Sequence, residues 1–282
     1  MTSPKFPQLD LESMRGTRDA LHAYARVLGD YLKAIRDKRK HWWHASLRPS
    51  LLGVTTGVIS AEPNIEMELD FRGSCLCLRT ATGEVHREAL KGQSARQLAD
   101  VIDGFLCTAG IDKNPGERID IDAVDRQTFA GYSGEQANTI GRAFSDVAAT
   151  MSSFRAGIRE ESSPIQIWPH HFDLSMLWLP GELIAAQDPD NEEYADKQMN
   201  FGFVLGDDSI SQPYFYITAY PLPDALAGTS LPPGATWQTK PFPAAVLLYE
   251  TLAAENDPSA FLLTLWRNLL DAGRTHMLDE HS

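Results

Sequence analysis

The sequence is short of cysteine, of long hydrophobic runs and of positive charge. Its three cysteines, Cys75, Cys77 and Cys107, are too few for a disulfide framework and indicate reduced thiols. No apolar run approaches the ~20 residues that cross a bilayer, and residues 1–13 lack the apolar core of a signal peptide. These absences predict a cytoplasmic protein with no membrane partner.

The charge balance narrows the possible partners. Lys and Arg number 25 against 38 Asp and Glu, which gives a formal net charge of −13. A negative field of that size opposes contact with nucleic acid phosphates, so we expect no nucleic acid partner. The basic run at 36–40 is best explained as the solvated end of a helix, where the helix dipole favours cations.

Several catalytic motifs are also missing. Gly53 and Gly57 lack the spacing of a phosphate-binding or dinucleotide-binding loop. The sequence has neither a nucleophile elbow nor an HExxH motif on a helical pattern. ATPases, NAD-dependent dehydrogenases and the common hydrolases are therefore poor explanations of the chain.

Hydrophobic spacing predicts the secondary structure. Apolar residues recur every three to four positions in four segments, which predicts amphipathic helices at 17–38, 94–108, 135–157 and 257–273. Alternation predicts strands at 41–48, 51–60, 65–71, 75–80, 84–90, 171–178, 199–205 and 212–220, with a short one at 119–122. The clearest strand alternates Ile65, Met67, Leu69 and Phe71 with Glu66, Glu68 and Asp70. One face of this strand should be core and the other should face water.

Short glycine turns between the strands predict antiparallel neighbours. The fold class is therefore α+β, with largely antiparallel sheets and helices packed on one face. A similar order of elements in 17–110 and 133–274 predicts two pseudo-equivalent halves, residues 1–125 and 126–282, within one compact unit. A single domain with internal pseudo-twofold organisation is the alternative.

The segment Ser163 to Trp178 is the centre of the candidate site. If 171–178 is a strand, His171 and Asp173 share one face because side chains alternate with period two. The other face, which we expect to be buried, holds Phe172, Leu174, Met176 and Trp178. We expect His171 and Asp173 to open into a partly buried pocket that also receives His44.

The residues of this candidate site suit two kinds of chemistry, one with a metal ion and one without. His44, His171 and Asp173 can ligate a divalent metal ion, because two imidazoles and one carboxylate leave positions open for a substrate. The same residues can act without metal as an acid–base group, with His41 or His170 nearby. In the structural alternative, each imidazole is a packed residue satisfied by a hydrogen bond.

Two other patterns have simpler explanations. Cys75 and Cys77 would share one face of a strand, a poor metal clamp without further thiols, so we expect small core residues there. Tyr214, Tyr216 and Tyr220 would line up on one strand face, which is typical of sheet residues with hydroxyl groups in water. We count neither pattern as a site.

Five parts of the chain together resemble a bacterial family of uncharacterised proteins, known only as a domain of unknown function. They are Gly16-Thr-Arg-Asp-Ala-Leu-His-Ala-Tyr24, His41-Trp-Trp-His44, Gly53-Val-Thr-Thr56, Ser163-Pro-Ile with Phe172-Asp173-Leu, and Pro213-Tyr-Phe-Tyr with Ala219-Tyr-Pro221. The likeness spans almost the whole chain, and the HWWH and FD segments are its most specific parts. In members of that family His41, His44 and Asp173 match, whereas Gly and Ser can stand in place of His170 and His171. The resemblance implies no activity.

Two functions from different classes follow. The first is a small-molecule enzyme in which His44, His171 and Asp173 act together, with or without a divalent metal ion. The alternative is a non-catalytic small-molecule binding or structural protein, whose histidines are hydrogen-bonded core residues and whose Trp and Tyr surfaces line a pocket. Either function allows a small-molecule ligand, and the sequence carries no signal for its identity or for an oligomeric state.

Overall fold

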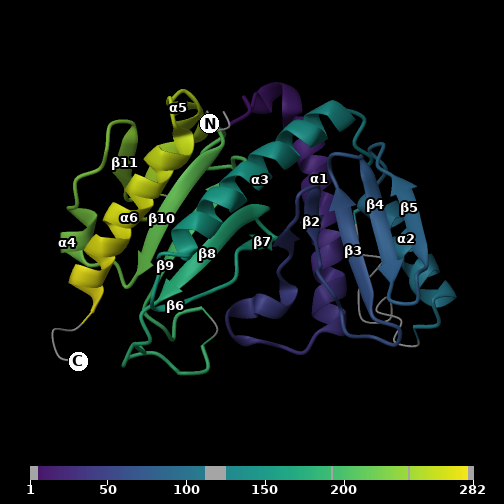
Figure 1. Ribbon diagram of the computed structural model, residues 1–282, viewed down its shortest axis with the longest axis horizontal. Helices are drawn as coiled ribbons and strands as arrows, with labels where there is room; N and C mark the ends of the chain where they lie inside the picture. The colour runs from purple at the N-terminus through teal and green to yellow at the C-terminus, as the bar shows by residue number, and fades with distance from the viewer. Residues whose placement is uncertain (1–5, 112–124, 192, 241, 279–282) are drawn as a thin grey trace. The chain divides into compact units, whose positions relative to one another are not determined.

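The computed structural model shows an α+β protein with two antiparallel sheets, as the sequence predicts (Figure 1). The structure describes residues 6–111, 125–191, 193–240 and 242–278. Within these ranges the N-terminal unit comprises 9–145 and 167–172, and the C-terminal unit comprises 6–8, 146–166 and 173–278. The pseudo-equivalence of halves at 1–125 and 126–282 stays a prediction. The short strand expected at 119–122 lies outside the described residues.

The sheet of the N-terminal unit has five antiparallel strands in sequence order. They are β1 (Arg48–Pro49), β2 (Gly53–Thr55), β3 (Ile65–Asp70), β4 (Cys75–Thr80) and β5 (Val85–Ala89). One face of β3 is apolar because Ile65, Met67 and Leu69 alternate along it, and all three are buried together with Phe71, as predicted.

Two long helices belong to the same unit, α1 (Leu11–Ile35) and α2 (Ala95–Thr108). α1 begins earlier than the predicted residue 17 because Asp10 caps it. Ser94 and Gln97 form the capping box at the start of α2. The Tyr31 hydroxyl on α1 donates to Asp103 on α2 at 2.5 Å, so a partly buried hydrogen bond as well as apolar packing joins the two helices.

The opposite face of β3 is less exposed than the alternation predicts. Glu68 and Asp70 are each 7% exposed. Arg79 on β4 donates to Glu68 at 2.9 Å, and the Ser50 hydroxyl donates to the same carboxylate at 2.8 Å. Arg79 also lies 3.7 Å from Glu66. Cross-strand pairing therefore makes this face a bonded polar network, not a solvated one.

The sheet of the C-terminal unit has the strand order β11-β12-β10-β9-β8-β6, all antiparallel. Its strands are β6 (Glu161–Ser162), β8 (Asp173–Leu179), β9 (Gln198–Val204), β10 (Tyr214–Tyr220), β11 (Ala235–Gln238) and β12 (Ala244–Leu248). Neither β11 nor β12 is predicted from the sequence. The hydrophobic side of β8, formed by Leu174, Met176 and Trp178, is buried as predicted.

Aromatic side chains of two helices pack against the hydrophobic side of this sheet. Phe154, near the end of α3 (Gly134–Arg155), lies 4.8 Å from Phe201 on β9, measured between ring centroids. Its ring is also 5.4 Å from Trp266 on α6 (Pro258–Met277), which runs along the sheet in Figure 1. Two short helices, α4 (Asp224–Ala227) and α5 (Tyr249–Ala253), complete the unit.

The strand predicted at 41–48 is wrong. The chain forms the 3₁₀ segment η1 (Lys40–Ala45) there, before β1. His41 and Trp42 have φ values of 53° and 57°, in the left-handed region that a strand does not use. The Arg39 N–H donates to His44 Nδ1 at 3.1 Å, and such a local side-chain bond to the backbone favours a turn over a strand.

The strand predicted at 171–178 starts too early. β7 (Gln166–Trp168) ends at a turn over 169–172, and β8 begins only at Asp173. The Phe172 N–H donates to the Trp168 carbonyl at 2.7 Å, and Phe172 has φ of 55°. This bond closes a single helical turn, so His171 lies on a turn and not on the strand face.

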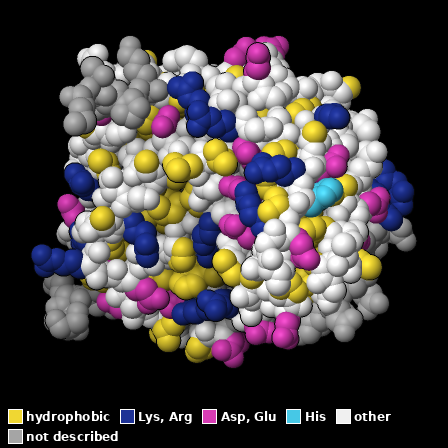
Figure 2. Space-filling view, turned by 45° about the vertical axis from the view of Figure 1, so that its right-hand side comes forward, with side chains coloured by type: hydrophobic (Ala, Val, Ile, Leu, Met, Phe, Trp, Pro, Cys, Tyr) yellow, Lys and Arg dark blue, Asp and Glu magenta, His cyan; other side chains and the backbone are white. Residues whose placement is uncertain are grey.

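No helix among the described residues is long and apolar enough to cross a membrane. The expected cytoplasmic location stays a prediction. On the face in Figure 2, Lys and Arg side chains are interspersed with Asp and Glu. The expectation that nucleic acid is not a partner likewise stays a prediction.

Candidate functional site

The predicted site residues fall in both units. His44 and His171 belong to the N-terminal unit, as do His41 and His170, whereas Asp173 opens β8 in the C-terminal unit. The site that joins His44, His171 and Asp173 therefore stays a prediction. Each part can be described within its own unit.

His44 is an inward-facing residue of η1. Its side chain is 5% exposed, and its Nδ1 accepts the Arg39 N–H. Its ring stacks on Trp42 at 5.5 Å between centroids. His41 is also buried, with its ring 5.6 Å from that of Trp43. The contacts of His44 match the structural alternative for the HWWH segment, in which packing and a local hydrogen bond hold the imidazole.

His170 and His171 are exposed on the turn before β8, so the expectation that His171 is partly buried is wrong. Their rings lie 4.4 Å apart. His22 on α1 reaches the same turn, because its Nε2 is 3.2 Å from the His170 carbonyl and its ring stacks on Phe172 at 5.6 Å. The three imidazoles form one surface group within the N-terminal unit.

Burial and nearby positive charge lower the pKa of two of these histidines, His170 and His22. Desolvation, followed by repulsion from His171, Lys33 and His22, lowers the pKa of His170 to about 4. Burial lowers the pKa of His22, and Arg26 acts in the same direction. Neutral imidazoles can accept a proton or bind a metal ion at neutral pH. The turn at 169–172 brings the His170 carbonyl to His22.

Asp173 lies in a polar cluster on one face of the C-terminal sheet. It is 5% exposed, and the Tyr216 hydroxyl donates a very short hydrogen bond to its Oδ2. The strand register explains why Tyr216 reaches Asp173. Gly202 on β9 pairs with Ser175 on β8 and with Tyr216 on β10, so these three residues form one cross-strand row next to Asp173.

The electrostatics of the pair fix the position of its proton. Burial raises the pKa of Tyr216 well above its usual value, and the negative charge of Asp173 raises it further. A hydrogen bond with Ser175 acts in the opposite direction. The phenol therefore keeps its proton and donates it in the hydrogen bond, while the carboxylate accepts.

The same sheet face carries other buried polar atoms. Asn200 lies two residues before Gly202 on β9, and Gln238 lies on β11. Among the described residues, Asn200 Oδ1 and Gln238 Nε2 are buried without a hydrogen-bond partner. Buried polar atoms are usually bonded to protein or water, so this acceptor and this donor are each open to a further polar partner. A second pair, Tyr214 to Asp207 at 2.7 Å, lies further along β10.

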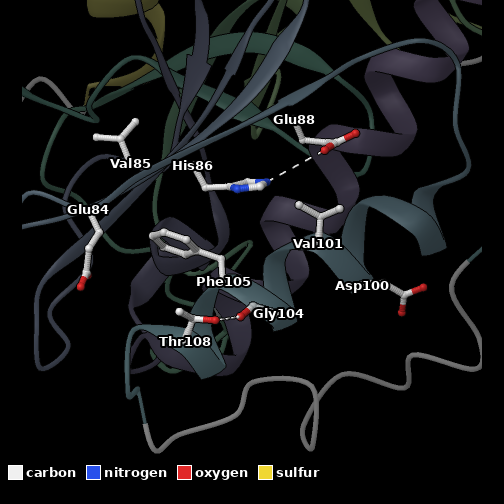
Figure 3. Close-up of a pocket in the computed structure, with 9 residues that line it drawn as sticks. All are labelled: Glu84, Val85, His86, Glu88, Asp100, Val101, Gly104, Phe105 and Thr108. Atoms are coloured by element: carbon white, nitrogen blue, oxygen red, sulfur yellow. Dashed lines mark hydrogen bonds and ion pairs between the residues drawn. The ribbon is translucent and has the colours of Figure 1, made fainter.

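A groove of about 450 Å³ lies elsewhere, between β5 and α2 of the N-terminal unit (Figure 3). His86 and Glu88 approach it from the strand, and Phe105 and Val101 line it from the helix. His86 Nε2 is 4.0 Å from Glu88 Oε2. An imidazole, carboxylates and apolar side chains line the groove.

Comparison with known families agrees with the resemblance seen in the sequence. The profile of a family of unknown function, DUF5996, matches residues 6–278. The chain belongs to this family. No curated protein and no solved structure matches it. Family membership therefore covers residues 6–278 without supplying a reaction.

Sequence reasoning found Asp173 but missed its partner. The row of Tyr214, Tyr216 and Tyr220 is correctly placed on one face of β10, but the hydroxyls of Tyr214 and Tyr216 bind carboxylates instead of water. The sequence signal for this contact is Gly202. A glycine inside an otherwise bulky strand often marks the close approach of another group. From the sequence we expect Cys75 and Cys77 to be core residues and not a metal site, whereas the structure places Asp70 beside both thiols, in a set that could hold a metal ion.

Proposed function

We propose that this member of DUF5996 is a small-molecule enzyme that moves a proton at the Asp173–Tyr216 pair. The observation that supports the proposal is the partly buried hydrogen bond from the Tyr216 hydroxyl to the buried Asp173 carboxylate. Perturbed, paired titratable groups are enriched at catalytic sites because catalysis needs a proton held at a defined atom.

The cost of the cluster supports a functional role. A carboxylate on a sheet face is expensive to bury unless hydrogen bonds compensate, and an apolar pair of the same shape would be as stable or more stable. The orphaned atoms of Asn200 and Gln238 on the same face add to that cost. Binding of a polar substrate that satisfies these atoms would offset it.

The residues have separate roles in this proposal. Asp173 is the proton acceptor, and Tyr216 orients its carboxylate by donating to Oδ2. Because the pKa of Tyr216 is raised, its hydroxyl stays a donor throughout the physiological range. His44 and His171 remain the predicted imidazole partners, with a divalent metal ion as an optional companion.

The test compares conservative variants on purified protein. The wild type is incubated with a pooled small-molecule extract, and mass spectrometry follows which compounds are consumed. Asp173→Asn and Tyr216→Phe should abolish the consumption. Tyr214→Phe removes the neighbouring hydroxyl bond to Asp207 and should retain it, which makes it the matched control. Consumption that is equal in wild type and Tyr216→Phe would refute the proposal.

The groove between β5 and α2 supports the second candidate, a non-catalytic small-molecule binding protein. Its lining of His86, Glu88 and Phe105 needs no reaction to explain it. Under this candidate the extract contains compounds that the protein retains unchanged, and Gly104→Ala at the groove wall weakens their retention. Asp173→Asn would leave retention intact, which separates the two functions.

A further inference from the structure

The polar face of the N-terminal sheet holds two thiols opposite a carboxylate. Asp70 at the end of β3 is the register partner of Cys75 at the start of β4, and Cys77 lies two residues further on the same face. One potential ligand atom from each of the three residues lies within 4.8 Å of the others. The two Sγ atoms are 3.4 Å apart. The sequence contains this pair of thiols, but only the register supplies the third ligand.

Asp70 differs from the other acids on this face. Glu68 accepts from Arg79 and Ser50, and Glu66 accepts from Thr55 at 2.8 Å. Within the described part of the chain, Asp70 has no cationic side chain within 4.0 Å, although it is only 7% exposed. A buried carboxylate without a cation carries an electrostatic cost that a bound metal ion would remove.

We propose that Asp70, Cys75 and Cys77 bind a Zn²⁺ ion, with water in the fourth position. Two thiolates and one carboxylate are ligands that zinc accepts, and three protein ligands leave one open position. Zn–S bonds of ~2.3 Å in a tetrahedron place the sulfurs about 3.8 Å apart. The observed 3.4 Å is within reach of a small side-chain rotation.

Two features around the three ligands favour a bound ion: a hydrogen bond that orients Asp70 and an open side at Cys75. Asp70 Oδ1 accepts the Gly73 N–H at 2.6 Å, and this bond orients the carboxylate as the outer hydrogen bonds of metal sites do. Cys77 is fully buried while Cys75 is partly exposed, so an ion can enter past Cys75. The site belongs to the N-terminal unit, whereas Asp173 and Tyr216 belong to the C-terminal unit, and the inference does not rest on the proposed function.

A metal ion that binds the two sulfurs must displace the Arg87 guanidinium and the thiol protons. The exposed Arg87 places Nη1 3.2 Å from Cys77 Sγ and 3.7 Å from Cys75 Sγ. Burial and the adjacent Cys75 raise the pKa of Cys77 to about 11, so its thiol is protonated without metal. On binding, both thiols lose their protons to solvent and the guanidinium swings outward.

The test is a titration of the full-length, tag-free protein with Co²⁺ under reducing conditions, followed by competition with Zn²⁺. We expect one equivalent of Co²⁺ to produce a thiolate-to-metal charge-transfer band, which Zn²⁺ then removes. Cys75→Ser and Cys77→Ser should each lose the band, and Asp70→Asn should weaken binding by at least about tenfold. Arg87→Ala should bind the ion more tightly because it removes a neighbouring positive charge.

Cys107→Ser is the matched control, since Cys107 is an exposed thiol on α2 and should leave the band unchanged. Thermal unfolding shows whether each variant is folded, and the partly exposed Cys75 provides a second thiol variant if Cys77→Ser unfolds. Absence of the band in the wild type at stoichiometric Co²⁺ would overturn the proposal. A band that survives both Cys75→Ser and Cys77→Ser, or that is lost in Cys107→Ser, would overturn it equally.

Discussion

Gly202 on β9 lies directly beneath the ring of Tyr216 on β10. A Cβ at Gly202 would be 2.1 Å from Tyr216 Cζ and 2.4 Å from its Oη, closer than any real Cβ contact. The missing side chain lets the phenol lie across β9 and reach Asp173 on β8. A glycine inside a strand weakens it, so this one is explained by the close approach that it permits.

Gly202→Ala should therefore destabilise the protein and break the Asp173–Tyr216 pair together. We expect a loss of about 1–3 kcal/mol in the free energy of unfolding, from overpacking. Urea denaturation measures it. Gly104→Ala is the control, because a Cβ there meets nothing within 4 Å and should stabilise α2 by roughly 0.5–1 kcal/mol. A Gly202→Ala protein as stable as wild type would show that the ring moves aside without cost.

The two-point ion pair between Glu160 and Arg274 should stabilise the C-terminal unit. Arg274 Nε and Nη2 each donate to one oxygen of Glu160 at 2.7 Å. The guanidinium lowers the pKa of Glu160 from 4.5 to about 2. Because the folded pKa is the lower one, the stabilisation is present above pH 4.5 and is lost as pH falls towards 2.

Glu160→Gln should cost about 1 kcal/mol at neutral pH, since the pair is partly solvated. The difference from wild type should shrink as pH falls through that window. Asp271→Asn removes the other, exposed carboxylate that contacts Arg274 and should cost less. Unfolding midpoints measured across the pH series check both, and a Glu160→Gln deficit that persists unchanged at pH 2 would contradict the ion-pair explanation.

The sequence predicts the elements whose pattern is local. β3 has an uninterrupted alternation from Ile65 to Asp70, and the capping box at Ser94 marks the start of α2. Both are confirmed because hydrophobic period and cap chemistry depend on neighbours in the chain. The α+β class follows from the same local signals.

The failures have a common physical cause. His41 and Trp42 are held in left-handed φ values that no propensity predicts, and Phe172 closes the turn that removes His171 from β8. The meeting of Asp173 with Tyr216 depends on the register of β8, β9 and β10, which only the folded sheet fixes. Sequence reasoning therefore identified the carboxylate of the candidate site and missed the hydroxyl that orients it.

Leu174→Ala tests the hydrophobic side of β8. Leu174 is fully buried and pairs with Phe203 in the register of β8 and β9. Truncation leaves a cavity that the aromatic core cannot fill, so we expect a loss of ~2–5 kcal/mol. Leu183→Ala, at an exposed leucine, is the control and should cost little. Denaturant midpoints that coincide for wild type and Leu174→Ala would contradict the packing described for this face.

The histidine group of the N-terminal unit should make stability depend on pH. The folded pKa of His170 is about 4 and that of His22 is also lowered, both from a usual value of 6.5. A lowered folded pKa means that the unfolded chain binds the proton first, so stability is lost as pH falls from 6.5 towards 4. The charged groups that act on this pair are His171, Lys33 and Arg26, with Arg18 at its edge.

His22→Gln and His170→Gln should each flatten the pH dependence of unfolding between pH 6.5 and 4. Glutamine keeps polarity and much of the volume but carries no proton to titrate. The effect of His22 should be the larger, because its ring stacks on Phe172 and is held at the His170 carbonyl, whereas His170 is exposed. His276→Gln removes an exposed imidazole on α6 and provides the control. Chemical unfolding at closely spaced pH values measures the slopes. If the two variants lose stability with acid as steeply as wild type, the lowered pKa values of His22 and His170 do not set the pH dependence of unfolding.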